Sequence, residues 1–457
     1  MSPKPIDQIP TTKTPILPVR AMDLANSTVG GNIEAIADLL KQGGVGDPLE
    51  MDDETLIDIM EHVVVVHGDL GTGERLDGAQ LRRAIESSPF LRYQFIIFVL
   101  GLFHLKMACA DAIWRIFIKP LQARLDSTSV MEDIGYLRPR ETGKIISNPG
   151  FRRMHEVIGH DGTCRRLDCW RVEATKESST FEDLDQYAES KPTFSDLIKV
   201  AGRLARNYVG KPSMLRRLRR RPVAQRDEQY ENNLLVNQYF LLYEEITYAM
   251  NRGDIGHVEV CFAPWVCIFK ATGKHKYASA MIKHITNVHF HYPAGLKKAI
   301  RHSMLVNPSG REGCFRAVDW VVELYNLFIK RVHGGSGSTR TMENIIKESI
   351  LVQLFKHTHS TLEKNLVLSH LTTHHSEPDM TTTFATVTAH MAEKAVHCPN
   401  PGRKTKYTIV DMIGKGMQAL KVSKGPGDNA ADKSEGVDEA DFELTPEEED
   451  ILLDMDL

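Results

Sequence analysis

The stretch HVVVVHGDLGT, residues 62–72, decides the fold class expected for this chain. A run of four valines that ends at a glycine predicts a short strand buried on both faces, as in the middle of an α/β sheet. Asp69 follows this strand, and the carboxyl ends of central strands are where α/β folds hold ligands and metals. The alternative is that Asp69 merely caps the turn through Gly68 and Gly71. Both interpretations stay open at this point.

The residues that follow repeat the pattern. Residues 58–118 contain the valine strand, a helix, a second apolar strand at 92–100 and a buried helix at 103–118. This order of elements favours two adjacent parallel strands. His104 stands just past the second strand, so we expect it close to Asp69, as a structural hydrogen-bond donor or as a ligand or base.

A second signal lies far along the chain, in RAVDWVVELYNLFIK at residues 316–330. On a helix its polar residues share an arc of roughly 60°, and all residues between them are apolar. This polar seam consists of Asp319, Glu323, Asn326 and Lys330. One interpretation is a buried Asp–Glu–Lys network or a solvent-facing stripe. The other is an acid-bearing helix that faces the end of the valine strand.

Composition is that of a globular protein with a sizeable core, since 42% of the 457 residues are hydrophobic and 25% are charged. Seven scattered cysteines favour reduced thiols and an intracellular location. Residues 1–20 are rich in Pro and Thr without an apolar leader, and predict a flexible arm. Charged residues interrupt the most apolar window, 95–118, so we expect no membrane contact.

Charge is distributed unevenly. Residues 428–457 carry thirteen acids and one lysine, a net charge of −12, which leaves +8 on residues 1–427 out of the total of −4. A basic body suits a polyanion such as DNA, and with it a nuclear location. We expect the acidic tail to be disordered and to mimic a polyanion or bind a protein partner.

The densest basic run is LRRLRRRPVAQR, residues 215–226. It predicts either contact with a phosphate backbone, blind to sequence and sensitive to salt, or a solvated and mobile connection. No aromatic residues interrupt the run, which disfavours stacking on single strands. The candidate nucleic-acid ligands are Arg216, Arg217, Arg219, Arg220, Arg221 and, on the polar seam, Lys330.

Several common motifs are missing from the sequence. The spacing of His155, His160, Cys164 and Cys169 does not suit a zinc site. The chain contains no phosphate-binding glycine loop and no G-x-S-x-G nucleophile elbow. These absences disfavour a nucleotide-driven enzyme and a serine hydrolase.

Residues 20–395 carry a series of unusual strings in order, among them HGDLGT, GLFHLKMACADAIWR, LRPRETGK and NPSGREGCFRAVDWVVELYN. In these strings the chain resembles an uncharacterised domain family that is expanded in basidiomycete fungi. That family is a domain of unknown function, so the resemblance implies no activity.

The layout is more loosely similar to that of cut-and-paste transposases with an RNase H-like core. The similarity implies a mostly helical α/β fold, with a partial RNase H-like core and a large all-α insertion. It implies Asp69 and Glu323 as ligands of Mg²⁺, Asp319 as a second choice, and His104 as a group that contacts or orients the substrate. The corresponding activity would be DNA cleavage or strand transfer.

One departure affects the expected activity. An RNase H-like core opens with a β-hairpin that carries the first catalytic acid, and nothing before residue 58 predicts one. We therefore expect a truncated or decayed nuclease core, or a non-catalytic protein that binds nucleic acid or only holds a buried polar network. The expected organisation is an arm at 1–20, an α/β part at 21–120, a helical insertion at 121–310, core-completing helices at 311–400, and a linker and acidic tail at 401–457.

Overall fold

The computed structural model describes residues 4–25, 27–46, 59, 62–177, 181, 183–333, 341–366 and 379–422. Over these residues the chain is mostly helical with a small parallel strand pair, which confirms the expected fold class at that level. The acidic tail, residues 428–457, lies outside the described residues.

The strand–helix–strand–helix unit expected at residues 58–118 is present. It consists of β1 Val64–Gly68, α2 Leu70–Arg82, β2 Ile96–Leu100 and α3 Leu102–Phe117. The two strands are parallel neighbours, with Val64 opposite Ile96 and Gly68 opposite Leu100. The prediction of adjacent parallel strands is confirmed, and both strands end at the same edge. The prediction that the valine strand is buried on both faces is wrong, because all five residues of β1 are only partly buried and β1 pairs with one strand within the described residues. Their sheet holds two strands within the described ranges, and such a pair does not by itself define an RNase H-like core.

Three long helices join α3 in the main core. They are α6 Gly150–Glu177, α10 Glu228–Arg252 and α11 Ile255–Thr272. Thirteen of the sixteen residues of α3 are buried, as expected for a helix that is apolar nearly all round. By length and composition α11 is the one described helix that could cross a membrane, but half of it is buried here, and core helices pass the same test.

The remaining described elements are mostly short helices. They are α1 Val29–Gln42, α4 Val130–Leu137, α5 Thr142–Ser147, α7 Leu184–Glu189, α8 Phe194–Asn207, α9 Pro212–Arg219, α12 His275–Thr286, α13 Ala294–Ser303, α14 Val318–His333, α15 Met342–Ser349, α16 Val352–Asn365, α17 Thr381–Glu393 and α18 Met412–Val422. An antiparallel two-residue ladder joins β3 Leu305–Val306 to β4 Arg316–Ala317.

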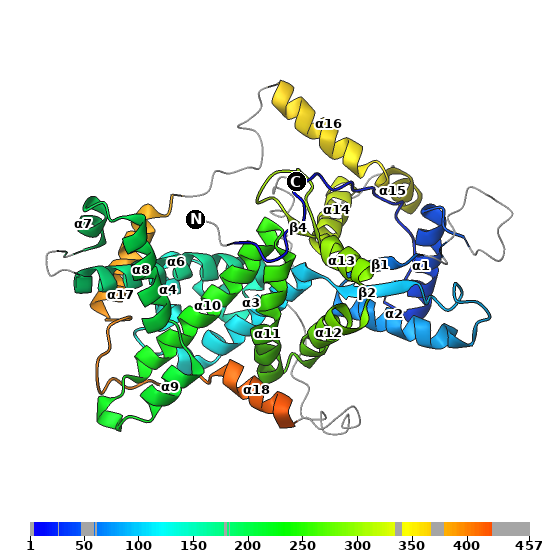
Figure 1. The fold of residues 1–457 in the computed structure, drawn as a ribbon. Helices are drawn as coiled ribbons and strands as arrows, with labels where there is room; N and C mark the ends of the chain where they lie inside the picture. Colours follow the sequence, from blue (N-terminus) through cyan, green and yellow to red (C-terminus); the bar gives the residue numbers. More distant parts are fainter. Residues whose placement is uncertain are drawn as a thin grey trace.

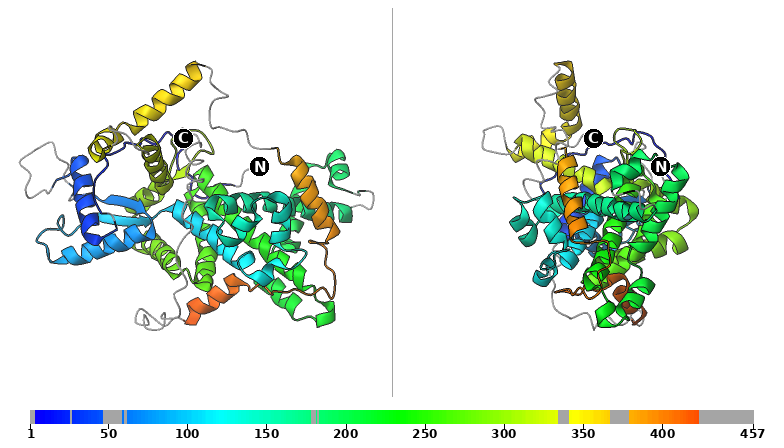
Figure 2. Two further views of the ribbon diagram at one scale, coloured as in Figure 1. Left: turned by 180° about the vertical axis from the view of Figure 1, so that it is seen from behind. Right: turned by 90° about the vertical axis from the view of Figure 1, so that its left-hand side faces the viewer.

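The molecule has two ends of different character (Figure 1). The strand pair lies at one end among α1, α2, α12 and α14, and α6 to α10 form the all-helical other end, as the reverse view also shows (Figure 2). Helix α14 packs against both α3 and β1. The polar seam is therefore carried by a helix that contacts the strand pair, as the sequence suggested.

The N-terminal segment differs from the expected flexible arm. The amide of Ile6 donates to Asp254 Oδ2 at 3.0 Å, and that of Ile9 donates to the Gly253 carbonyl at 2.9 Å. Asp7 forms an ion pair with Arg301 of α13. These contacts bind the described part of the segment to the helical body.

The beginning of the expected C-terminal linker is also folded onto the body. The guanidinium of Arg403 makes two hydrogen bonds to the carboxylate of Asp227, at 2.8 and 2.6 Å. Helix α18 packs on α11 so closely that a Cβ atom at Gly416 would lie only 1.9 Å from the Cys267 carbonyl oxygen. Only a glycine permits this approach of the two helices.

Candidate functional site

Asp69 lies where β1 ends and serves as the N-cap of α2. Its carboxylate accepts a hydrogen bond from the Thr72 amide at 2.6 Å. Burial alone would raise the pKa of Asp69, but the hydrogen bonds from Thr72 and the positive charges of His104 and Arg75 outweigh burial and lower it. The capping role that the sequence left open is thus present.

Asp319, on α14, caps helix α3, which lies more than 200 residues earlier in the sequence. It lies in the first turn of α14, is 4% exposed, and accepts hydrogen bonds from the amides of Phe103 at 3.1 Å and His104 at 3.0 Å. These amides belong to the first turn of α3, whose own N-cap, Gly101, has no side chain to offer. A Cβ atom at Gly101 would lie 2.2 Å from Asp319 Oδ2. A carboxylate at the positive end of α3 is favourable, and the glycine makes room for it.

The same carboxylate orients the imidazole of His104. Nδ1 of His104 lies 2.9 Å from Asp319 Oδ2, and since a carboxylate only accepts, Nδ1 donates and Nε2 is left for another partner. Burial alone would lower the pKa of His104, but the hydrogen bond to Asp319 and the charges of Asp319, Glu323 and Asp69 together raise it. The predicted grouping of these four residues around the strand ends is therefore present in the structure.

The polar seam runs from the interior to the surface. Asp319 is buried, Glu323 is half-buried, and Asn326 and Lys330 are exposed. Glu323 makes no hydrogen bond or ion pair with another described residue, although its charge acts on His104. The seam is thus neither a buried Asp–Glu–Lys network nor a uniform solvent-facing stripe.

The arrangement does not fit a two-ion Mg²⁺ site. Such a site needs several carboxylate oxygens that are free to converge on the ions. Both oxygens of Asp319 are occupied by donors from α3. Within the described ranges, no three His, Cys, Asp or Glu side chains are grouped so that they could hold a metal ion.

Two further ionisable groups near this edge were not predicted as site residues. His67, in β1, lies 3.1 Å from Ser303 Oγ through Nε2, and burial lowers its pKa to about 4. The amine of Lys106 lies over the rings of Phe151 and Tyr243, and burial, with a smaller contribution from the nearby charge of Arg316, lowers the pKa of Lys106 to about 7. In the sequence, the only indication that these two groups are buried is that each lies in or directly after a long apolar run.

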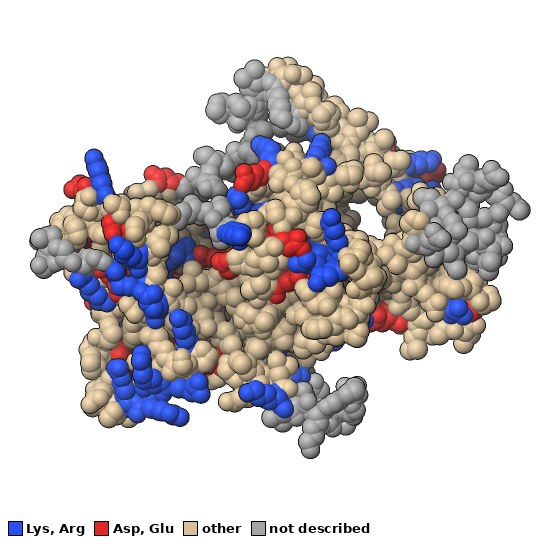
Figure 3. Space-filling model, in the orientation of Figure 1, with Lys and Arg blue, Asp and Glu red and all other residues tan. Residues whose placement is uncertain are grey.

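The basic run forms a surface on helix α9 and the residues after it, at the end of the molecule opposite to α14 (Figure 3). Arg219 points inward, where it pairs with Glu231 at 3.4 Å and donates to the Ile409 carbonyl at 2.6 Å. The other four arginines are exposed and form the α9 basic face: Arg216, Arg217, Arg220 and Arg221. Lys330 does not belong to this surface.

None of the four arginines of the α9 basic face has a carboxylate partner in the part of the chain that the structure describes, and Arg216 donates to the Pro212 carbonyl at 3.2 Å. Arg217 and Arg221 also line a cavity of about 290 Å³, together with Arg226 and Lys176. Arg226 is held by Glu231 at 2.8 Å, and Lys176 is held by Glu173 at 3.0 Å. The two unpaired guanidinium groups are therefore the cavity's available cations.

A sequence model of a family of unknown function, DUF6589, matches residues 1–375. The chain belongs to this family. The match to DUF6589 covers most of the chain, including both strands, the polar seam and the α9 basic face. No curated protein and no solved structure gives a significant match.

The match to DUF6589 ends before α17 and α18. Both helices nevertheless pack on elements inside the matched region, α17 on α4 and α6, and α18 on α11. The folded body therefore extends beyond the residues that the DUF6589 match covers.

Proposed function

We propose that this DUF6589 protein binds the phosphate backbone of nucleic acid through the α9 basic face. One observation carries the proposal: Arg217, on α9, and Arg221, two residues beyond the end of α9, are exposed, line the same cavity and have no carboxylate partner among the described residues. Two unpaired arginines that line the same cavity suit the phosphates of a nucleic-acid backbone, which guanidinium groups bind through paired hydrogen bonds. Such contacts are independent of base sequence.

We propose in addition that the strand ends descend from a metal-dependent nuclease, of the RNase H-like type found in cut-and-paste transposases. The support is the layout: one acid directly after β1, a histidine just after β2, a long helical region, and then helix α14, whose acids act on the histidine at the strand ends. In the present protein Asp69 and Asp319 act as helix caps. Under this proposal the two acids have an architectural role, and DNA binding is the function that the protein retains.

The test is a salt titration of DNA binding. Fluorescence anisotropy of a labelled duplex is measured with the wild type and with the Arg217→Ala/Arg221→Ala double variant over a range of salt concentrations. Each phosphate contact contributes about 0.9 to the slope of log K against log salt, so we expect the double variant to lower the slope by about 2.

The matched control removes the same charge elsewhere. Arg82→Ala/Lys298→Ala changes two exposed cations that lie on α2 and α13 and have no carboxylate partner in the described part of the chain. We expect this control to keep the wild-type slope. Equal slopes for both double variants, or no binding to duplex or single strand at low salt, would overturn the proposal.

A second candidate function is a surviving metal-dependent nuclease. It is favoured by Glu323, which has no partner among the described residues and lies near His104. Asp69 and Glu323 would be the ligands of Mg²⁺ or Mn²⁺. The test is the thermal midpoint of the wild type and Glu323→Ala with and without millimolar Mn²⁺. A rise confined to the wild type supports the candidate, and no rise in either protein removes it.

A further inference from the structure

The cavity beside the α9 basic face is lined by cations and by apolar groups. Its volume is about 290 Å³, and its lining comes from the ends of α6 and α8, from α9 and the residues that lead into α10, and from residues 397–401. We call it the α9 cavity. Pockets for small molecules begin at about 300 Å³, so the α9 cavity has room for one nucleotide-sized group rather than for a length of strand.

The charge of the α9 cavity suits a doubly charged anion. Arg217 and Arg221 line it and have no carboxylate partner among the described residues. The two carboxylates in the lining are already neutralised, because Asp227 pairs with Arg403 at 2.6 Å and Glu231 has two arginine partners. An entering anion therefore meets two available positive charges.

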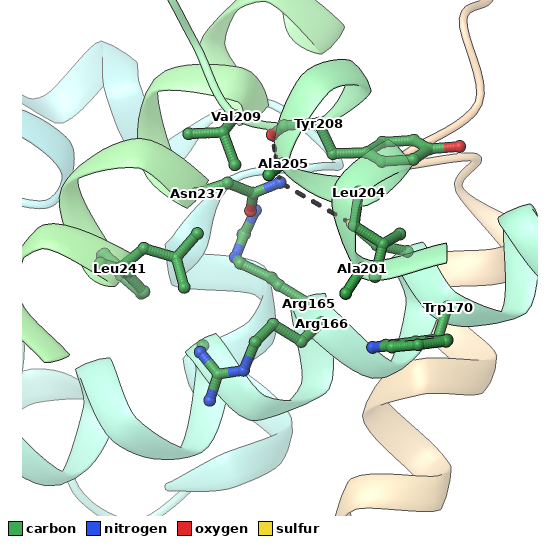
Figure 4. Close-up of a pocket in the computed structure, with 13 residues that line it drawn as sticks. Arg165, Arg166, Trp170, Ala201, Leu204, Ala205, Tyr208, Val209, Asn237 and Leu241 are labelled. Atoms are coloured by element: carbon green, nitrogen blue, oxygen red, sulfur yellow. Dashed lines mark hydrogen bonds between the residues drawn. The ribbon is translucent and has the colours of Figure 1, made fainter. Parts of the chain in front are cut away.

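A second cavity, of about 250 Å³ between α6, α8 and α10, provides a comparison (Figure 4). It also contains two arginines, but Asp133 and Asp161 hold Arg165, and Glu244 holds Arg166. An anion there would have to compete with carboxylates that are already in place. The difference between the two cavities is that the arginines of the α9 cavity are available.

Two available charges in a concave site distinguish between the phosphates of a strand. A phosphate inside a strand carries one negative charge and has a nucleotide on each side. A terminal phosphate is a monoester, with a charge of about −1.5 to −2 at pH 7 and a nucleotide on one side only. Guanidinium groups bind phosphate oxygens through paired hydrogen bonds. The α9 cavity therefore suits the end of a strand better than its middle.

Apolar groups in the lining suit the nucleoside that carries such a phosphate. They include Met214 and Leu218 from α9, and Pro399 and Pro401. Tyr208 lines both cavities, and Figure 4 shows its ring pointing away from the second one. The basic run has no aromatic residue of its own, and the fold supplies this one from the end of α8.

We propose that the α9 cavity binds the terminal phosphate of a single nucleic-acid strand. The inference rests on the proposed function and names the part of the nucleic acid that the site recognises. Arg217 and Arg221 hold the phosphate, and the terminal nucleoside contacts the apolar groups. Arg216 and Arg220 belong to the α9 basic face but do not line the cavity, so they are left for the phosphates that follow.

The test compares three single strands of one sequence with the full chain. Each has an internal fluorescent label, and they end in a 5′-phosphate, in a 3′-phosphate or in hydroxyl groups alone. We expect one phosphorylated strand to bind at least about tenfold more tightly than the hydroxyl strand in anisotropy titrations at pH 7. Equal affinities would overturn the inference and leave the proposed function standing, whereas no binding of any strand would refute both.

Two double variants of equal charge locate the phosphate. In Arg217→Ala/Arg221→Ala we expect the preference for the phosphorylated strand to disappear. The matched control, Arg216→Ala/Arg220→Ala, lies on the same basic face outside the cavity lining, so it should weaken all three strands alike and keep the preference. A preference that survives the first pair of substitutions, or that both pairs abolish, overturns the assignment.

Competition separates a strand end from a free nucleotide, which carries the same phosphate. Adenosine monophosphate lacks the phosphates that Arg216 and Arg220 would contact. We therefore expect it to displace the labelled strand only at concentrations at least about tenfold above those of the unlabelled phosphorylated strand. Displacement at equal concentrations would assign the site to a free nucleotide and overturn the proposal of a strand end.

Discussion

Replacing Asp319 by alanine removes the acceptor that caps α3. The amides of Phe103 and His104 would be left at the buried start of that helix without a partner. An unpaired buried donor costs about 1–3 kcal/mol, and the lost carboxylate at the helix terminus costs about 0.3–1 kcal/mol more. Partial relaxation offsets some of this, so we expect the free energy of unfolding to fall by about 3 kcal/mol.

Urea denaturation followed by circular dichroism measures this loss. The matched control is Glu323→Ala, one turn further along α14, which removes a carboxylate that makes no hydrogen bond to another described residue. We expect the control to stay within about 0.5 kcal/mol of the wild type. Equal losses in the two variants, or a loss below about 1 kcal/mol for Asp319→Ala, would refute the capping role.

Three further predictions concern other parts of the fold. Burial lowers the pKa of His67 from 6.5 to about 4, so between these pH values the unfolded chain binds a proton that the folded chain does not. The free energy of unfolding therefore falls as the pH falls from 6.5 to 4. His67→Gln should reduce the difference between the free energies of unfolding measured at pH 7 and pH 5. Arg165→Met leaves Asp133 and Asp161 buried without their cation, and should lower the free energy of unfolding by about 3–5 kcal/mol in urea. Gly416→Ala should detach α18 from α11, seen as faster hydrogen exchange in α18 than in the wild type.

The parts of the fold that could be predicted from the sequence are those with a local pattern. The valine run and the apolar run at β2 are continuous, and the glycines after them mark where each strand ends. Helix α3 has almost no polar face, which by itself indicates burial on all sides. Parallel pairing then follows from the helix between the two strands.

The docked N-terminal segment could not be predicted in this way. Its composition is polar and rich in Pro, which is typical of a flexible arm. Its position depends on Asp254, at the start of α11, and Arg301, on α13, both more than 240 residues away in sequence. Complementarity between such distant groups leaves no periodic signal.

The sequence predicted which residues meet at the strand ends, but not whether their carboxylates are free or serve as helix caps. Strand order and the spacing of the polar seam bring Asp69, His104, Asp319 and Glu323 to one edge, and the structure places them there. Whether an acid is free or occupied depends on how α14 packs against α3. A shift of less than one turn between these helices would take Asp319 away from the amides of α3 and leave its oxygens available.

The capping role of Asp319 also limits what metal binding could achieve. An ion that used Asp319 would have to displace the hydrogen bonds from Phe103 and His104, at a cost near the ~3 kcal/mol expected for the alanine variant. A ligand at about 100 times its dissociation constant stabilises the folded state by about 2.7 kcal/mol. Millimolar Mn²⁺ would therefore need a dissociation constant on the order of 10 μM merely to offset that loss.

Weaker binding must leave α3 capped and use Asp69 and Glu323 without Asp319. The Mn²⁺ shift in Glu323→Ala is therefore informative about metal, whereas Asp319→Ala lowers stability under either interpretation.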